Sequence, residues 1–273
     1  MSTPVRRLSV AILTGAALLV GACASAGSAA TSPLPPANGQ FDYQIGGAYT
    51  PSSTVAIVDR DRLEKPAAGK YNICYVNAFQ TQPDDATWWK TNHDDLLLKK
   101  ANGKYVIDSG WNEMLLDTST AAKRTALLAI VGGWIDGCKT SGYKAVEPDN
   151  LDSYSRSSTL LTKQNNIAFA KLLAARAHAD GLAIAQKNDS SMASNGKAIG
   201  FDFAIVEECQ VYDECGDFTT AYGAQVYEIE YTDNGGTSNF TKACTARGAT
   251  TSVIYRDRDV VPKGTSGYVY KYC

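Results

Sequence analysis

Two apolar stretches of the sequence each end in acidic side chains. Residues 144–152 read Lys-Ala-Val-Glu-Pro-Asp-Asn-Leu-Asp, and residues 201–209 read Phe-Asp-Phe-Ala-Ile-Val-Glu-Glu-Cys. Because proline cannot donate to a sheet ladder, we expect the first strand to stop at Pro148, directly before Asp149. Glu207 is the first acid after the second apolar run. Asp149 and Glu207 are therefore the candidates for paired-carboxylate chemistry.

Two carboxyl groups at the ends of different strands can face each other across the mouth of a barrel. Glycoside hydrolysis needs such a pair, since one group protonates the leaving oxygen and the other attacks the anomeric carbon or activates a water. A purely structural interpretation competes with this one. Asp149-Asn150 is also typical of a turn, and Asp152-Ser153 of a helix cap.

Of the two acids, we expect Asp149 to be the nucleophile and Glu207 the general acid/base of a retaining hydrolysis. Inversion with Asp149 as the base is the alternative, and the distance between the two carboxyl groups distinguishes the two mechanisms. A short Asp suits a fixed nucleophile, and Lys187, at the end of the next expected strand, would keep it ionised. Glu208 and the apolar strand behind Glu207 would raise the pKa of Glu207, as a general acid requires at neutral pH.

The rest of the chain alternates between short apolar strands and helices. Apolar residues at helical spacing predict helices over 121–140 and 165–180. Strands are expected over 55–58, 72–76, 114–116, 144–146, 182–186, 201–206, 225–229 and 251–255. This order predicts an α/β fold, a single-domain (β/α)8 barrel of the TIM type. An open doubly wound sheet is the alternative, which the lack of a Gly-rich phosphate loop after the first strand disfavours.

Polar side chains follow nearly every expected strand, which predicts a polar mouth at one end of the barrel. They are Asp59, Asn77, Asp117, Asp149, Lys187, Glu207, Glu230 and Asp257. Aromatic side chains are frequent, with 15 Tyr and 4 Trp, and sugar rings stack on such faces. Taken singly, Trp88, Trp89, Trp111 and Tyr231 are more typical of core packing.

The N-terminal segment is typical of an exported bacterial protein. We expect residues 1–30 to be an export signal, because Arg6 and Arg7 precede an apolar run. The sequence Val-Gly-Ala-Cys at 20–23 also resembles a lipobox, which would make Cys23 a lipidated N-terminus and the protein an extracellular or cell-surface lipoprotein. Cleavage after Ala26 or Ala30 is the alternative. A flexible tether over 31–40 and one catalytic domain over 41–273 are expected to follow.

Six cysteines remain when Cys23 is set aside, and an exported chain with six suggests up to three disulfides. Cys209 and Cys215 are six positions apart and are expected to pair across a loop. The other four cysteines are then expected to form two further pairs. The expected pairs are Cys209–Cys215, Cys244–Cys273 and Cys74–Cys138.

Composition limits the partners and cofactors. The mature chain carries 28 acidic and 24 basic residues, since the signal holds two Arg and no acid, and this excess of acids argues against nucleic acid. His93 and His178 are the only histidines and no CxxC occurs, so we expect no metal site. Paired-carboxylate chemistry requires no cofactor. Without a Gly-x-Ser-x-Gly elbow, serine-based catalysis is poorly supported. We expect a monomer.

Five motifs carry a resemblance to one family. Residues 73–78 read Ile-Cys-Tyr-Val-Asn-Ala, 146–152 read Val-Glu-Pro-Asp-Asn-Leu-Asp, 186–188 read Gln-Lys-Asn, and 201–209 are followed by Glu-Tyr at 230–231. Together they resemble glycoside hydrolase family 114, the endo-α-1,4-polygalactosaminidases with a TIM-type barrel. The resemblance spans 41–231, and more weakly the tail. It matches Asp149 and Glu207 to the family's catalytic Asp and Glu. Glu208 stands where Gln is expected, which leaves open whether Glu207 or Glu208 is the acid.

The resemblance implies an exported, endo-acting hydrolase of α-1,4-linked galactosamine polysaccharide, a cationic chain that an acidic mouth would attract. Substrate-binding side chains are expected at Asp59, Tyr75, Glu147, Asn150, Asp152, Lys187, Asn188, Glu208, Glu230 and Tyr231. Two alternatives stay open. One is a surface lipoprotein that binds amino-sugar polymer without cutting it, and the other is an α-galactosidase-like or amylase-like enzyme on the same fold.

Overall fold

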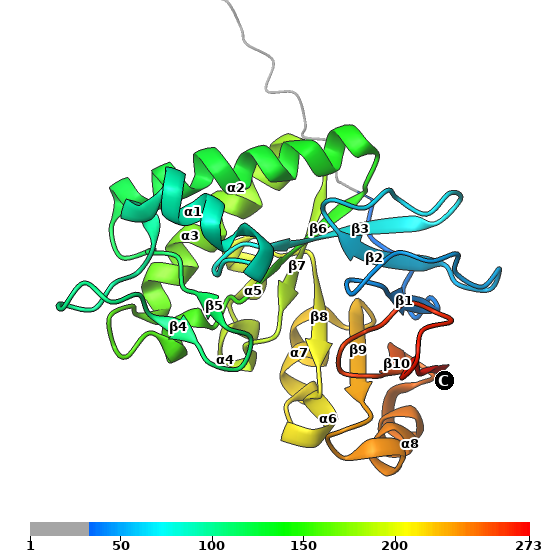
Figure 1. Ribbon diagram of the computed structural model, residues 1–273. Coiled ribbons are helices and arrows are strands. Elements are labelled where there is room, and N and C mark those ends of the chain that lie inside the picture. The colour runs from blue at the N-terminus through cyan, green and yellow to red at the C-terminus, as the bar shows by residue number, and fades with distance from the viewer. Residues whose placement is uncertain (1–32) are drawn as a thin grey trace, which may run out of the picture.

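A computed structural model describes residues 33–273, and its centre is a nearly closed barrel of eight parallel strands (Figure 1). Each strand pairs with the next one of the barrel along the chain, and one short antiparallel strand, β11 (Tyr270–Tyr272), is added after the eighth. The barrel strands are β1 (Phe41–Tyr43), β2 (Ile57–Asp61), β3 (Tyr71–Asn77), β6 (Ala145–Asp149), β7 (Ala183–Lys187), β8 (Phe203–Glu207), β9 (Val226–Tyr231) and β10 (Ser252–Arg256). The expected single-domain barrel is confirmed.

Side chains rather than a strand ladder join the two ends of this sheet. Arg256, fully buried at the end of β10, donates to the backbone oxygen of Tyr43 in β1 and to that of Val269, 2.9 Å away. From β11, the Tyr270 hydroxyl donates to the Phe41 oxygen at 2.8 Å. The guanidinium and the tyrosine therefore satisfy backbone oxygens along the seam, as buried polar groups require.

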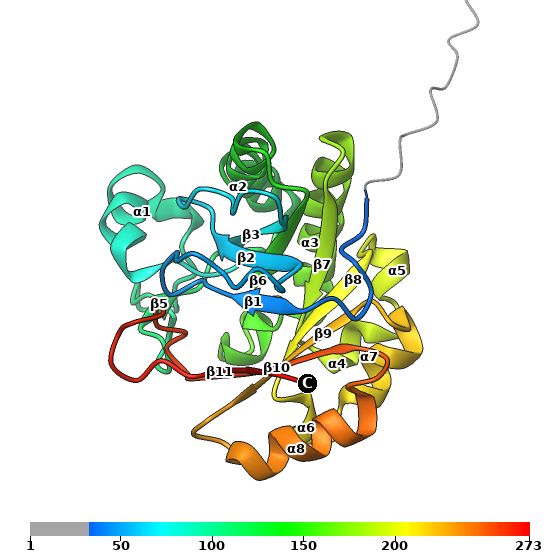
Figure 2. The same cartoon turned by 90° about the vertical axis from the view of Figure 1, so that its right-hand side faces the viewer.

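Helices cover the outside of the barrel from β3 onward (Figures 1 and 2). Loops 44–56 and 62–70 connect β1, β2 and β3, so helices do not alternate with the first strands as expected. In residues 33–273, no helix is both long enough and apolar enough to cross a membrane. The α-helices are α1 (Ala86–Asn92), α2 (Ala121–Ser141), α3 (Lys163–Ala179), α4 (Ser190–Ala193), α5 (Gly196–Ile199), α6 (Cys209–Tyr212), α7 (Cys215–Tyr222) and α8 (Gly236–Arg247), and the 3-10 turns are η1 (Pro83–Asp85), η2 (Asp94–Leu96) and η3 (Ser153–Arg156).

The two long helices begin and end where local chemistry dictates. The Thr120 side chain accepts from the Lys123 backbone N–H at 3.2 Å and caps α2. Gly142 ends that helix in the left-handed conformation, with φ of 100°. Thr162 and Asn165 form a reciprocal capping box at the start of α3. Both helices expected from the sequence are confirmed.

One of the eight expected strands lies outside the barrel. The stretch over 114–116 belongs to a hairpin of β4 (Ile107–Asp108) and β5 (Glu113–Met114), which lies between β3 and α2 along the chain. Its place in the barrel is taken by β1, a three-residue strand that the sequence pattern missed. The short apolar run of the hairpin is locally indistinguishable from a barrel strand, because the difference lies in the partner strand rather than in its own residues.

Residues 33–40 are packed against the barrel rather than forming a tether. The Tyr227 hydroxyl donates to the Pro35 and Pro36 oxygens, each at 3.1 Å, and the Tyr71 hydroxyl donates to the Pro33 oxygen at 2.6 Å. The Gln40 oxygen accepts from the Ala56 N–H at 2.9 Å. The expected tether over 31–40 is therefore wrong from residue 33 onward. The expected signal over 1–30 and Cys23 lie outside the described residues.

All three expected disulfides are present. Cys74–Cys138 ties β3 to α2, Cys209–Cys215 joins α6 to the start of α7, and Cys244–Cys273 fastens the C-terminus to α8. The last bridge holds the chain end beside β11, next to the seam of the barrel. Such cross-links stabilise a fold mainly by restricting the unfolded chain.

Candidate active site

Strand register carries polar side chains to one mouth of the barrel. Along each strand alternate residues point inward, and the inner face is apolar near the N-terminal ends, as with Ile57, Ala145 and Ile205. At the carboxyl ends the inward positions become polar. They are Tyr43, Asp59, Tyr75, Glu147, Asp149, Lys187, Glu207 and Tyr231. The carboxyl ends of parallel barrel strands are where catalytic groups gather.

Lys187 lies at the centre of this cluster, with a side chain only 1% exposed. Its Nζ is 2.9 Å from Glu147 Oε1, 3.4 Å from Asp149 Oδ1 and 3.4 Å from Glu207 Oε2. It also donates to the Tyr43 hydroxyl at 2.9 Å. Burial alone would lower the pKa of Lys187, but the three carboxylates raise it well above its ordinary value. One ammonium thus holds both candidate catalytic acids.

Asp149 is fixed by donors on both of its oxygens. The Tyr75 hydroxyl donates to Oδ2 at 2.9 Å, and the Asn150 backbone N–H donates to Oδ1 at 2.7 Å. Asn150 adopts a positive φ of 67°, which Asn tolerates, and its Nδ2 donates to Asn77 Oδ1 at 2.9 Å. The strand does not stop at Pro148 as expected. Pairing of β6 with β7 ends at Val146, whereas pairing with β3 continues to Asp149.

Glu207 is held in the same way from the other side of Lys187. Asn188 donates through Nδ2 to Oε2 at 2.9 Å and accepts the Glu207 N–H at 2.8 Å, and the Tyr231 hydroxyl donates to Oε1. Burial raises the pKa of Glu207, but Lys187, Tyr231 and Asn188 together bring that pKa below its ordinary value. The raised pKa expected from the sequence is therefore wrong for the free enzyme.

Glu208 does not stand beside Glu207 as a second acid. Its positive φ of 59° turns the side chain toward Arg258, whose NH1 and NH2 contact its two oxygens at 3.1 and 2.5 Å. The same guanidinium contacts Asp233 Oδ1 at 2.9 Å and stacks 4.1 Å above the Tyr231 ring. Glu208 thus anchors the cation that covers Tyr231, and Glu207 is the carboxylate that faces Lys187.

A groove made of three adjoining hollows crosses the mouth. A central hollow of about 210 Å³ lies over Asp149, Lys187 and Glu207, and two further hollows flank it. Trp111, at the tip of the β4–β5 hairpin, and Arg258 line all three. Twelve carboxylates and three cations line the groove as a whole, so its charge is strongly negative.

Seven of the ten expected binding residues line this groove: Tyr75, Asn150, Asp152, Lys187, Asn188, Glu208 and Tyr231. The other three do not. Asp59 and Glu147 are fully buried one layer below the floor, and Glu230 is fully buried on the outside of β9, where Asn239 of α8 donates to it at 2.8 Å. Burial raises the pKa of Glu230 to about 7. None of these three is open to a ligand, which corrects the expectation that they bind substrate.

Sequence reasoning missed several groups of the site. Tyr43 belongs to the strand that was not recognised, and Arg258 follows Asp257, the polar residue expected after the last strand. Trp111 was expected to pack in a core, but it is 57% exposed over the groove, whereas Trp89 is buried as expected. Only the hairpin turn at 109–112, with its Gly and Asn, signals that Trp111 stands at a loop tip.

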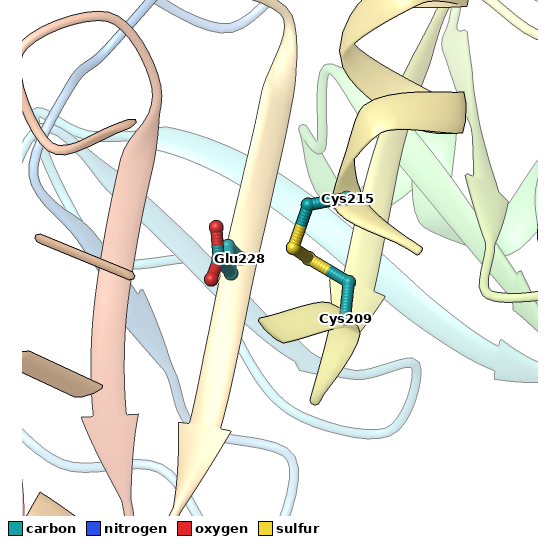
Figure 3. A group of neighbouring side chains, drawn as sticks. All are labelled: Cys209, Cys215 and Glu228. Carbon is teal, nitrogen blue, oxygen red and sulfur yellow. A yellow bond between two sulfur atoms is a disulfide. The ribbon is translucent and has the colours of Figure 1, made fainter. Parts of the chain in front are cut away.

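The described residues include one group of potential metal ligands: Cys209, Cys215 and Glu228 (Figure 3). The two sulfurs form a disulfide, so they cannot act as thiolate ligands. Glu228 is already held by Arg247, whose NH2 lies 2.7 Å and Nε 2.8 Å from its two oxygens. This cluster braces α6 and α7 behind the strand that carries Glu207, and its chemistry does not suit a metal ion.

Comparisons with known proteins identify one family and solved structures of the same fold. The model of a family described as glycoside-hydrolase family GH114 matches residues 22–273. The solved structure of Aspergillus fumigatus Ega3 in complex with galactosamine is 24% identical, with a TM-score of 0.71, over 90% of this chain and 100% of that one. The glycoside hydrolase domain of PelA from Pseudomonas aeruginosa is 16% identical, with a TM-score of 0.55, over 83% of this chain and 97% of that one. A search of curated protein sequences returned no match.

Proposed function

Because the chain belongs to glycoside-hydrolase family GH114, and is thus a glycoside hydrolase, we propose that it cleaves α-1,4-linked galactosamine polymers internally, with Asp149 and Glu207 as its catalytic carboxylates. The observation that carries this proposal is the shared ammonium. Lys187 contacts both carboxylates at 3.4 Å, and both remain partly open to the central hollow, at 19% and 24% side-chain exposure. The galactosamine complex of Ega3 supports the choice of sugar.

We assign Asp149 as the nucleophile and Glu207 as the general acid/base. Two contacts of 3.4 Å to one nitrogen keep Asp149 Oδ1 and Glu207 Oε2 at most about 7 Å apart, which accommodates the ~5–5.5 Å spacing of retaining enzymes. Because the pKa of Glu207 is lowered in the free enzyme, this carboxyl must take up a proton as the substrate enters. The proton is taken up on Oε1, which accepts only from the Tyr231 hydroxyl, since Oε2 faces the ammonium and the Asn188 amide.

The shape and charge of the groove support internal cleavage of a cationic chain. Hollows on both sides of the catalytic pair leave room for sugars in both directions, as an endo-acting enzyme needs. Carboxylates outnumber cations twelve to three along this path, so protonated amines are attracted over about 8 Å at physiological salt. The exposed Trp111 offers a stacking face for one ring.

The proposed activity predicts a product ladder. Digestion of α-1,4-linked galactosamine polymer is expected to release intermediate oligomers first, with a rate that falls as salt rises. The fully N-acetylated polymer is the matched control, because its uncharged chain should show little salt dependence. Mass spectrometry of early time points is the measurement. Release of monosaccharide alone would contradict internal cleavage, and an intact polymer would contradict the activity.

We also propose that the protein is exported and anchored through Cys23. The three disulfides support export, because such bonds persist in oxidising compartments. The lipobox-like sequence at 20–23 predicts that the mature chain begins with a lipidated Cys23. Mass spectrometry of the mature N-terminal peptide is expected to show the lipid mass on Cys23. A mature chain that begins at Thr31 without lipid would exclude the anchor.

A further inference from the structure

Two buried carboxyl groups lie beneath the groove without enough partners. Asp59 of β2 is fully buried, and no N–H or O–H group of the described residues donates a hydrogen bond to either of its oxygens. Glu147 of β6 is also fully buried, and its Oε2 has none. The two side chains interact directly with each other. Two facing carboxylates cannot satisfy one another, because an ionised carboxylate only accepts hydrogen bonds.

Charge balance requires a proton in this pair. Glu147, Asp149 and Glu207 already share the single ammonium of Lys187. A fourth unpaired negative charge at this fully buried position would cost far more free energy than protonation of the carboxyl group. One member of the Asp59–Glu147 pair is therefore a neutral acid that donates to the other.

The contacts place that proton on Asp59. Glu147 Oε1 lies 2.9 Å from the Lys187 ammonium and accepts from the Tyr43 hydroxyl at 3.2 Å, and both contacts favour its ionised form. Asp59 forms no salt bridge with a lysine or arginine of the described residues. Its burial, and next the neighbouring Glu147, raise the pKa of Asp59 well above its ordinary value.

We propose that Asp59 is a neutral carboxylic acid that donates to Glu147 Oε2 and so positions the Lys187 ammonium. Asp59 is a positioning residue, because it touches neither substrate nor reacting atoms. The chain of contacts runs from Asp59 to Glu147, from Glu147 to Lys187, and from Lys187 to the two catalytic carboxylates. The inference rests on the proposed roles of Asp149 and Glu207 only at this last step.

A matched pair of variants tests the donor role. Asp59→Asn keeps a donor of the same size, so kcat/KM is expected to stay within about threefold of wild type. Asp59→Leu removes the donor and leaves Glu147 Oε2 unpaired, so Lys187 shifts and kcat is expected to fall by about 10²-fold, as for small misplacements in other active sites. A large loss of kcat in the folded Asn variant would overturn the proposal, because a group needed as a charge is not replaced by an amide.

The pH dependence of stability gives an independent readout. The titratable groups around Asp59 are Glu147, Asp149, Lys187 and Tyr143, and all are unchanged in the Asn variant. Since the pKa of Asp59 is raised on folding, the folded wild type binds a proton that the unfolded chain loses above about pH 4, so the contribution of Asp59 to stability falls as the pH rises. The melting temperatures of Asp59→Asn and wild type are expected to agree near pH 4, with the variant higher at pH 8. The proposal would be overturned if the melting temperature of Asp59→Asn, relative to that of wild type, were lower at pH 8 than at pH 4.

Infrared spectroscopy locates the proton without any substrate. At pH 8 the wild type is expected to show a carbonyl band of a protonated carboxyl that is absent from Asp59→Asn. Glu230, with a pKa of about 7, contributes little at this pH and cancels in the difference spectrum. A band that persists in Asp59→Asn and disappears in Glu147→Gln would assign the proton to Glu147 and overturn the proposal. Because neither spectrum nor melting curve needs activity, failure of the proposed hydrolysis would leave this test intact.

Discussion

Asp149→Asn is expected to lower kcat by at least about 10³-fold on galactosamine polymer, and Glu207→Gln by about 10²–10⁴-fold. Both amides fill nearly the same space and keep the neighbouring donors, so the loss reports chemistry rather than folding. Asp149→Asn removes the atom that would attack the anomeric carbon. Glu207→Gln removes the proton that the leaving oxygen requires.

Azide separates the two roles. Asp149→Ala with azide is expected to yield a glycosyl azide of inverted anomeric configuration, because the small anion enters from the side that the carboxylate has left. Glu207→Ala with azide is expected to yield the retained anomer, since azide then attacks the glycosyl-enzyme intermediate on Asp149. Asp217→Asn, an exposed carboxylate on α7, is the matched control and should match the wild-type rate. Wild-type activity in either catalytic variant would exclude the assignment, and exchanged azide products would reverse the roles.

The sequence predicted that Asp149 and Glu207 lie close together, because both acids follow apolar runs and the carboxyl ends of parallel strands meet at one mouth. The sequence did not predict how deep each inward-facing side chain lies within the barrel. Glu147 and Asp149 are two positions apart on one strand and both point inward, but one is fully buried and the other opens into the groove. Which layer forms the floor depends on the stagger of neighbouring strands, and no local pattern records that stagger.

The error at Glu230 was avoidable. Successive side chains on a strand point to opposite faces, so Glu230 and Tyr231 cannot both face the mouth. Tyr231 continues the inward series of Tyr227 and Ile229, which places Glu230 outside. The strand over 114–116 is a different kind of error. Its residues suit any strand, and only the long-range pairing of β1 with β2 shows that the barrel is complete without it.

Lys187→Met is expected to impair stability and activity together, because both depend on the buried Lys187 ammonium. Removing one partner of a buried ion pair typically costs about 3–5 kcal/mol of unfolding free energy, and here the ammonium contacts three carboxylates. Met fills most of the space of the lysine stem, so loss of charge rather than a cavity dominates the change. Lys123→Met is the matched control. Lys123 contacts Asp95 at the surface, through its carboxylate at 3.6 Å and its backbone oxygen, and its replacement should change stability by less than about 1 kcal/mol.

The pH dependence shows whether charge is the cause. In the wild type the pKa of Glu207 lies below its unfolded value, so Glu207 contributes stability that is present above about pH 4 and is lost as the pH falls through the folded pKa. Lys187 is the largest of the groups that lower this pKa, so its removal is expected to raise the pKa of Glu207 in the folded state. Thermal melting is therefore expected to show the largest deficit of Lys187→Met near pH 7 and a smaller one near pH 4. A deficit that is equal at both pH values would point to packing instead.

The same substitution is expected to lower kcat by about 10²–10³-fold, comparable to the loss of one preorganised donor at a charged centre. The acidic limb of kcat/KM reports groups of the free enzyme that must be ionised, and it is expected to move to higher pH when the ammonium is removed. Lys187→Arg separates charge from geometry. It keeps the charge, but its planar fork cannot reproduce the compact contacts of an ammonium with three carboxylates, so it should recover stability more than kcat. If Lys187→Met melts and turns over as the wild type does, the shared ammonium organises neither the fold nor the chemistry of this mouth.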